Sequence, residues 1–379
     1  MNLSYFVTIL PRFVKLLFKS LLIYSLQKPK LLNTYLKQRN MLLFLDNIRR
    51  LLICFHYITF NRSVNFLKSE ISYLISIFGV QLTRSISPFF LSIETANYCN
   101  LHCPECPVGI RQATKTDQLL FDITLYKQLI DNQKSTLQHV ILYFQGEPLL
   151  NKQLPEFIEY AHKANIYTST STNGQFLNKK NAREIVLSGL DKLIVSVDGS
   201  TQETYESYRK GGKLQKTLDG IKELVYWKKE LKSATPLIEI QFIVLKTNEH
   251  QLPDMKRLAK KMKADRLTFK TAQLYDFENG NDRLTTIKKY ARYKQMPDGK
   301  YQIRNSLPNH CHRIWSGAVI NAHGEVLPCC YDKNSEFSFG NINENPLNAC
   351  LHNKKATDFR NTILQNRKQY EMCQNCTSK

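Results

Sequence analysis

Ten cysteines are unevenly distributed along this chain of 379 residues. Three of them, Cys99, Cys103 and Cys106, form one compact C-x3-C-x2-C group, and six others fall between positions 311 and 376. A disulfide-stapled scaffold is typical of much shorter chains with a higher cysteine content. This clustering therefore favours metal ligation in a reducing compartment.

The first cysteine group has the donors of an incomplete iron–sulfur site. Thiolates ligate the iron of Fe–S clusters, and a complete [4Fe–4S] site normally uses four cysteines. Three thiols in one short loop leave one iron without a protein ligand, and a small bidentate molecule can bind there. A structural zinc site would need a fourth ligand, for which His102 is the nearby candidate. We expect a [4Fe–4S] cluster here, with zinc as the alternative.

A second group near the C-terminus has the full number of ligands for a closed [4Fe–4S] site: Cys311, Cys329, Cys373 and Cys376. A four-cysteine zinc site is the alternative. Cys330 directly follows Cys329, and adjacent side chains on a strand point opposite ways, so we expect only one of the two to ligate. The Gly-x4-Cys spacing from Gly324 favours Cys329, with Cys330 as the alternative. The two remaining cysteines, Cys54 and Cys350, are expected to be plain thiols.

The elements that must position these cysteines alternate between strand and helix. Phe90–Glu94 alternates as a strand and leads directly into the first cysteine loop. Strand patterns then recur at 140–144, 167–172, 193–197, 238–244 and 266–270, and helical patterns at 119–133, 154–164, 179–188, 215–231 and 252–262. Such alternation predicts a parallel sheet covered by helices.

Six β/α units are too few for a complete eight-stranded barrel, so we predict an α/β fold with a partial (β/α)6 TIM-like barrel. Active sites of such folds lie at the C-terminal ends of the strands, where the first cysteine loop falls. The predicted domains are a basic amphipathic helical extension (1–88), the core (89–275), a linker (276–300) and a small Fe–S domain (301–379).

The cysteine loop and the strand ends together resemble the radical S-adenosylmethionine (SAM) superfamily. The resemblance implies that SAM chelates the open iron and is cleaved to a radical that abstracts hydrogen from the substrate, with a flavodoxin or ferredoxin as electron donor. One position departs from the family. The residue before the third cysteine is usually aromatic and lies near the adenine, whereas Glu105 stands here.

The resemblance also implies SAM contacts outside the loop. Gln145-Gly146-Glu147-Pro148 looks like the family segment that holds the SAM amino group, and Thr172-Asn173-Gly174 closes the third strand as the family often does. Ser196 and Asp198 correspond to positions that reach the ribose or the methionine portion. Arg209 resembles the arginine that pairs with the SAM carboxylate.

The C-terminal cysteines resemble the SPASM domain, and more closely its one-cluster twitch form. Enzymes with a similar pair of domains include peptide maturases, sulfatase-maturing enzymes and aminocyclitol dehydrogenases. Peptide or protein modification is slightly favoured, and oxidation of a sugar, an aminocyclitol or a lipid-linked molecule is the alternative. A non-catalytic metal-binding protein is the second alternative.

The net charge of +21 is concentrated near the N-terminus. Residues 1–90 contain 12 lysines and arginines and two acidic residues, with apolar residues at helical spacing. Their apolar runs fall short of the roughly 20 residues that span a bilayer, and no secretory signal pattern is present. We expect a cytoplasmic protein without nucleic-acid binding, whose segment 1–85 either packs on the main body or contacts the inner membrane face.

Overall fold

The computed structural model describes residues 57–78, 87–111, 114–274 and 276–377. The chain divides into two compact units, residues 1–63 and 64–379, and all cysteines of the two groups lie in the second. The helices predicted within residues 1–56, and Cys54 with them, lie outside the described residues. Among the described helices, none is both long and apolar enough to cross a membrane.

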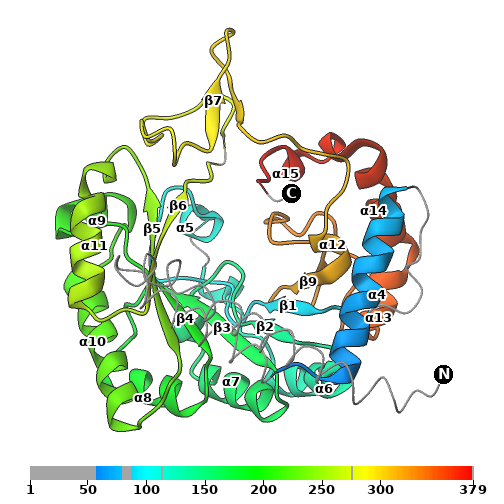
Figure 1. Cartoon of the computed structure of the whole chain (residues 1–379), viewed down its shortest axis with the longest axis horizontal. Helices are drawn as coiled ribbons and strands as arrows, with labels where there is room; N and C mark the ends of the chain where they lie inside the picture. The colour runs from blue at the N-terminus through cyan, green and yellow to red at the C-terminus, as the bar shows by residue number, and fades with distance from the viewer. Residues whose placement is uncertain (1–56, 79–86, 112–113, 275, 378–379) are drawn as a thin grey trace, which may run out of the picture. The chain divides into compact units, whose positions relative to one another are not determined.

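Six parallel strands, the first five of them followed by a covering helix, form the centre of the second unit and confirm the predicted α/β fold. The strands are β1 (Phe90–Ile93), β2 (His139–Ile141), β3 (Tyr167–Thr172), β4 (Lys192–Ser196), β5 (Leu237–Val244) and β6 (Arg266–Thr271). The helices that cover them are α6 (Ile123–Gln133), α7 (Leu154–Lys163), α8 (Lys179–Leu187), α10 (Leu214–Glu230) and α11 (Leu252–Lys261). Figure 1 shows these helices outside the curved sheet.

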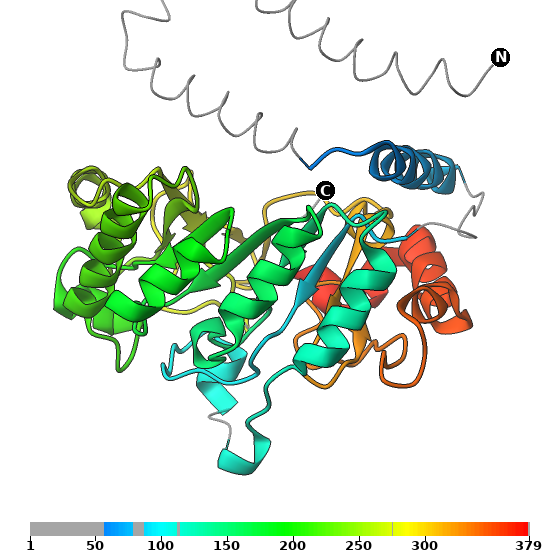
Figure 2. The same ribbon diagram turned by 90° about the horizontal axis from the view of Figure 1, so that it is seen from below.

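The two faces of this sheet differ in chemistry. Leu91 and Ile93 of β1 are fully buried in the main core, which includes residues of the covering helices seen in front of the sheet in Figure 2. The strand register places polar residues on the opposite face, where His139 bonds Ser169 at 2.8 Å and Lys192 pairs with Glu239 at 2.9 Å. Because successive strand residues point to opposite faces, the apolar set supports the fold and leaves the inner face polar.

Two short helices of the core escaped the sequence analysis. Helix α5 (Pro107–Arg111) follows the first cysteine loop, and α9 (Gln202–Tyr208) follows β4. The side chain of Thr201 caps α9 by accepting a hydrogen bond from the Thr204 N–H. The described part of the chain also contains single 3-10 turns: η1 (Lys115–Asp117), η2 (Pro148–Leu150) and η3 (Glu249–Gln251) in the core and η4 (Arg367–Gln369) in the C-terminal segment.

The C-terminal segment continues the core sheet. Strand β9 (Gly317–Ile320) pairs in parallel with β1, and β10 (Val326–Leu327) pairs antiparallel with β9, so the sheet order is β10-β9-β1-β2-β3-β4-β5-β6. The neighbouring helices are α12 (Arg313–Ser316), α13 (Leu347–His352), α14 (Lys354–Asn366), α15 (Glu371–Gln374) and α4 (Phe60–Ile77). The segment with the second cysteine group is therefore attached to the same sheet as the first cysteine loop, at the edge next to β1.

The segment predicted as a linker contains an antiparallel hairpin. Strands β7 (Tyr293–Gln295) and β8 (Tyr301–Ile303) pair with each other, and Gly299 takes a positive φ of 85° in their turn. Figure 1 shows the hairpin between the end of β6 and the C-terminal segment. The polar, turn-rich composition of this segment predicted a linker. Each strand of the hairpin has only three residues, which is too short for an alternating pattern to identify a strand.

Candidate functional site: two cysteine centres

The first cysteine loop runs from the C-terminal end of β1 into α5. The Cys106 N–H donates to the Cys103 carbonyl at 3.2 Å, which folds the loop back on itself. A Cβ on Gly109 would lie 2.5 Å from that same Cys103 oxygen, so only glycine fits. Burial, the charge of Glu147 and the neighbouring thiols Cys103 and Cys106 raise the pKa of Cys99 to about 12. Because iron binds thiolates, ligation must displace these protons.

One sulfur of the loop has an amide donor that the sequence analysis did not assign. Asn173, just after β3, directs its Nδ2 to the Cys99 sulfur at 3.5 Å and to Asn100 Oδ1 at 2.9 Å. The strand-end position of Asn173 was visible in the sequence, but its contact with sulfur depends on how two strands align. His102, the alternative zinc ligand, is exposed.

Glu147 is a buried carboxylate that joins two strand ends. It accepts hydrogen bonds from the Thr172 hydroxyl at 2.6 Å, the Asn173 N–H at 2.8 Å and the Leu149 N–H at 3.1 Å. Burial nevertheless raises its pKa above the ordinary value, because these bonds only partly offset desolvation. The structure thus places Glu147 beside the Cys99 loop with most of its acceptor sites occupied.

Gly146 brings β2 against the start of the same loop. A Cβ there would lie 2.0 Å from the Ala96 carbonyl, and the next residue's N–H bonds Tyr98 O at 2.9 Å. The backbone that approaches Gly146 closely is therefore that of the segment leading into the cysteine loop, and a side chain larger than glycine would not fit.

Arg209 and Asp198 form an ion pair that reaches the first cysteine loop. Arg209 Nε lies 2.5 Å from Asp198 Oδ2, and Nη1 lies 3.8 Å from the Cys103 sulfur. Asp198 is fully buried and also accepts the Ile243 N–H at 2.6 Å. Burial opposes the charge of Arg209, but Asp198 and Cys103 hold its pKa well above the ordinary value. Ser196 lies two residues before Asp198, at the end of β4, and is buried.

Glu105 contacts the segment after β6. Its Oε1 accepts Asn281 Nδ2 at 2.9 Å and lies 3.4 Å from Arg283 Nη1, and its side chain is 9% exposed. The sequence marked this position only as a departure from the family pattern. Its partners lie more than 170 positions away and have no motif to identify them.

The four predicted ligands of the second centre are all buried: Cys311, Cys329, Cys373 and Cys376. Burial, then the charges of Cys330, Cys311 and Cys373, raise the pKa of Cys329 well above its ordinary value. Among the described residues, no group of three or more His, Cys, Asp or Glu side chains is positioned to hold a metal ion.

Two arginines contact cysteine sulfurs in the C-terminal segment. Arg367 is 1% exposed and directs Nη2 to the Cys376 sulfur at 3.3 Å. Arg313 directs Nη1 to the Cys330 sulfur at 3.4 Å, and Cys330 packs with Phe144, Val319 and Leu327. The choice of Cys329 over Cys330 as the ligand stays a prediction. Cys350 is buried beside Gly340, as a plain thiol would be.

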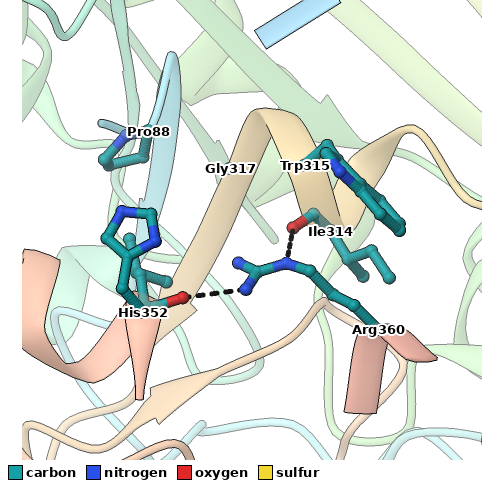
Figure 3. Close-up of a pocket in the computed structure, with 7 residues that line it drawn as sticks. Pro88, Ile314, Trp315, Gly317, His352 and Arg360 are labelled. Atoms are coloured by element: carbon teal, nitrogen blue, oxygen red, sulfur yellow. Dashed lines mark hydrogen bonds between the residues drawn. The ribbon is translucent and has the colours of Figure 1, made fainter. Parts of the chain in front are cut away.

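A buried arginine supports the backbone around Cys311. Figure 3 shows Arg360 of α14 reaching between α12 and α13, where it donates to the Ile314 carbonyl at 3.2 Å and to the Leu351 carbonyl at 2.8 Å. Burial lowers its pKa to about 10. Arg360 lines the small pocket drawn in Figure 3, and its guanidinium satisfies backbone carbonyls there. The pocket is therefore part of the scaffold that holds α12, the helix that follows Cys311 in the chain.

A cavity of about 720 Å³ opens at the ends of the strands. Its walls come from the strand ends, from the α5 region and from the loop after Cys330, and they include Glu94, Arg111, Gln145, Asn321, His323 and Lys333. Fourteen of its sixteen lining residues are polar, so hydrogen-bonding groups are available to whatever binds there.

Comparison with known proteins identifies both parts of the chain. Residues 93–226 match the model of the radical SAM superfamily, and residues 311–377 match that of the SPASM iron–sulfur cluster-binding domain. A tungsten-containing aldehyde ferredoxin oxidoreductase cofactor-modifying protein from Pyrococcus furiosus is 23% identical over 76% of this chain and 87% of its own length. The S-adenosyl-L-methionine-dependent 2-deoxy-scyllo-inosamine dehydrogenase of Niallia circulans is 24% identical over 76% of this chain and 92% of its own.

Two further comparisons concern proteins that act on or bind peptides. The PqqA peptide cyclase of Bradyrhizobium diazoefficiens is 25% identical over 64% of this chain and 66% of its own length. The structure of Streptococcus suis SuiB bound to S-adenosylmethionine aligns with a TM-score of 0.56 at 15% identity, covering 76% of this chain and 72% of SuiB. That structural likeness shows a shared fold.

Proposed function

This chain belongs to the radical SAM superfamily and carries a C-terminal SPASM domain, and from that premise we propose that it cleaves SAM reductively and abstracts hydrogen from a substrate carbon. When bound, SAM and a reduced [4Fe–4S] cluster supply the radical chemistry. The observation that carries the proposal is the loop of Cys99, Cys103 and Cys106 at a strand end, with Asn173 and Arg209 aimed at its sulfurs. A flavodoxin or ferredoxin would deliver the electron.

The strand-end residues have distinct tasks in this proposal. Glu147 has three protein donors, and a carboxylate offers about four acceptor sites, so one remains for the SAM ammonium group. Asp198 is buried and fixes Arg209 through Nε, so it positions the guanidinium whose other N–H groups pair with the SAM carboxylate. Ser196 is left as the ribose or methionine contact, and Gly146 keeps the loop close to β2.

Cys311, Cys329, Cys373 and Cys376 would hold the second [4Fe–4S] cluster, which accepts an electron from the substrate or binds it. The cavity at the strand ends is large enough for part of a peptide backbone or for a hydroxylated small molecule. We favour peptide or protein modification, and the aminocyclitol dehydrogenase among the relatives supports small-molecule oxidation as the alternative. Candidate peptides and aminocyclitols would be incubated with the enzyme in deuterated solvent. The class of molecule whose mass changes would be the substrate class.

The test of the reaction is anaerobic reconstitution with iron, sulfide, SAM and dithionite. We expect 5′-deoxyadenosine from the natural chain and about eight irons per chain, four for each cluster. Replacing Cys99, Cys103 and Cys106 by alanine should abolish 5′-deoxyadenosine and leave about four irons. Iron incorporation without 5′-deoxyadenosine from the natural chain would favour a non-catalytic metal-binding protein.

Helix α4 supports the proposed contact with the inner membrane face because its amphipathic pattern is inverted. Its buried side is polar, where Ser69 donates to the Trp315 carbonyl at 3.2 Å and Tyr73 bonds His310 at 2.6 Å. Large apolar side chains are exposed instead: Leu67, Ile71, Leu74, Ile77 and Phe78. Residues 1–56 add nine lysines and arginines and one acidic residue. A helix with an exposed apolar face, preceded in the sequence by a basic segment, fits an anionic bilayer surface. Such a surface attracts each basic residue by about 1 kcal/mol.

Vesicle flotation tests this contact. The full chain should float with phosphatidylglycerol-containing vesicles and much less with phosphatidylcholine alone. Replacing Leu67, Ile71 and Leu74 by glutamine should weaken binding by at least about tenfold, since each buried leucine contributes about 1.5–3 kcal/mol. The matched control replaces the equally exposed Leu187 on α8 and should float normally. Normal flotation of the α4 variant would show that something other than lipid covers this face.

A further inference from the structure

The segment after β6, residues 277–304, is attached to the first cysteine loop through Glu105. We call this segment the bracket. Asn281 Nδ2 and Arg283 Nη1 both reach Glu105 Oε1, at 2.9 and 3.4 Å. Asn281 also accepts the Arg283 N–H at 2.9 Å through its own side chain, which fixes the turn that presents both donors. Glu105 therefore holds a preformed turn.

A second set of bonds ties the bracket to the end of β5. The Lys246 N–H donates to the Arg283 carbonyl at 3.0 Å. The Glu249 carboxylate accepts the Thr286 N–H at 2.8 Å and the hydroxyls of Thr285 and Thr286. The bracket is thus fixed on two sides in the region nearest the first centre.

The other end of the bracket reaches the second centre. The Tyr293 hydroxyl donates to Asn375 Oδ1 at 2.7 Å, and Arg292 donates to the Asn375 carbonyl and to the Tyr331 hydroxyl. Asn375 lies directly before Cys376, and Tyr331 lies two residues after Cys329. The bracket therefore contacts residues beside ligands of both centres.

Apolar packing joins the same parts. Leu101 and Cys103 of the loop share one buried cluster with Phe277, Tyr293 and Ile303 of the bracket. Cys99, Cys106 and Leu284 pack against this cluster. The bracket thus forms an apolar wall on the first cysteine loop, and the Glu105 contacts lie at the edge of that wall.

We propose that Glu105 is a positioning residue that anchors the bracket against the first cysteine loop and thereby sets the geometry of SAM binding. In the family, an aromatic residue at this position lies near the adenine. Here the bracket wall supports the loop instead, and a carboxylate is needed to hold it. The proposal rests on the proposed SAM chemistry, but its anchoring part concerns the protein alone.

Limited chymotrypsin digestion of the anaerobic, reconstituted full chain tests the anchoring. Glu105→Gln, Glu105→Phe and Arg283→Gln should each speed cleavage within the bracket by about tenfold, because each breaks a charge-assisted bond. The matched control is Arg257→Gln, which breaks an exposed arginine–aspartate pair on α11 and should leave cleavage unchanged. Natural cleavage rates in the Glu105 and Arg283 variants would overturn the proposal.

Equilibrium dialysis of SAM against the same reconstituted proteins tests the consequence. Arg283→Gln lies outside the loop, so a loss of SAM affinity of about tenfold in it, as in Glu105→Phe, would show coupling through the bracket. Unchanged affinity in Arg283→Gln, or tighter binding in Glu105→Phe, would assign position 105 to the ordinary adenine contact and overturn the proposal. A natural chain that binds no SAM, with the digestion result intact, would refute the proposed function while leaving the anchoring in place.

Discussion

At the scale of single residues, cysteine sulfurs of both groups have nitrogen donors from distant positions in the chain. The cysteines carry their chemistry in residue type and spacing, which sequence preserves. Asn173, Arg209 and Arg367 donate to sulfurs from distant positions, and only the fold brings them there. Hydrogen bonds to sulfur help set the reduction potential of a cluster, so these donors belong to the chemistry of each centre.

Glu94 offers a residue-scale prediction on pH. Burial raises its pKa from 4.5 to about 7, against the backbone bonds it accepts and the charge of Lys333. A raised folded pKa gives stability that is complete below pH 4.5 and is lost as pH rises through 7. The difference corresponds to about 3 kcal/mol.

The measurement compares the thermal unfolding midpoints of the natural chain and Glu94→Gln across this pH range. Glutamine does not titrate, so the natural chain should lose stability relative to the variant between pH 4.5 and 8, mostly below and around pH 7. Midpoints that run parallel through the range would contradict the raised pKa.

At the scale of elements, long periodic segments were predicted well and long-range pairings were not. All six strands and five covering helices of the core are present, although β2 ends at Ile141 where a strand to 144 was predicted, and α6 begins at Ile123 where a helix from 119 was predicted. Helices α5 and α9 are too short for a periodic signal. The pairing of β1 with β9 joins residues more than 220 positions apart. The hydrophobic pattern of each strand does not indicate which distant strand it pairs with or in which register. The bracket was predicted as a linker because its side-chain partners lie in other elements.

Helix α5 carries an element-scale prediction through Gly109. Gly109→Ala places a Cβ 2.5 Å from the Cys103 carbonyl, so the loop must shift. We expect this variant to lose the first cluster, about four irons, and to keep the second. Gly299→Asn in the hairpin turn is the control, since a Cβ there meets nothing within 4 Å and asparagine tolerates the positive φ of 85°. Full iron content in Gly109→Ala, measured after reconstitution, would be inconsistent with the described loop.

At the scale of the whole molecule, the described fold connects two cysteine centres through one sheet and one bracket. The family, fold class and cofactors follow from motifs that appear in order along the chain. The substrate does not, because the cavity walls come from loops whose residues share no motif. Its polar lining narrows the choice to molecules rich in hydrogen-bonding groups.

The two centres are proposed to hold clusters of different kinds, one open to SAM and one closed. Electron paramagnetic resonance of the dithionite-reduced chain, with and without SAM, distinguishes them. We expect a SAM-sensitive [4Fe–4S] signal that persists when Cys311, Cys329, Cys373 and Cys376 are replaced by alanine. This signal should disappear when Cys99, Cys103 and Cys106 are replaced. A SAM-sensitive signal in the second variant, or none in the first, would show that the open cluster is not held by Cys99, Cys103 and Cys106.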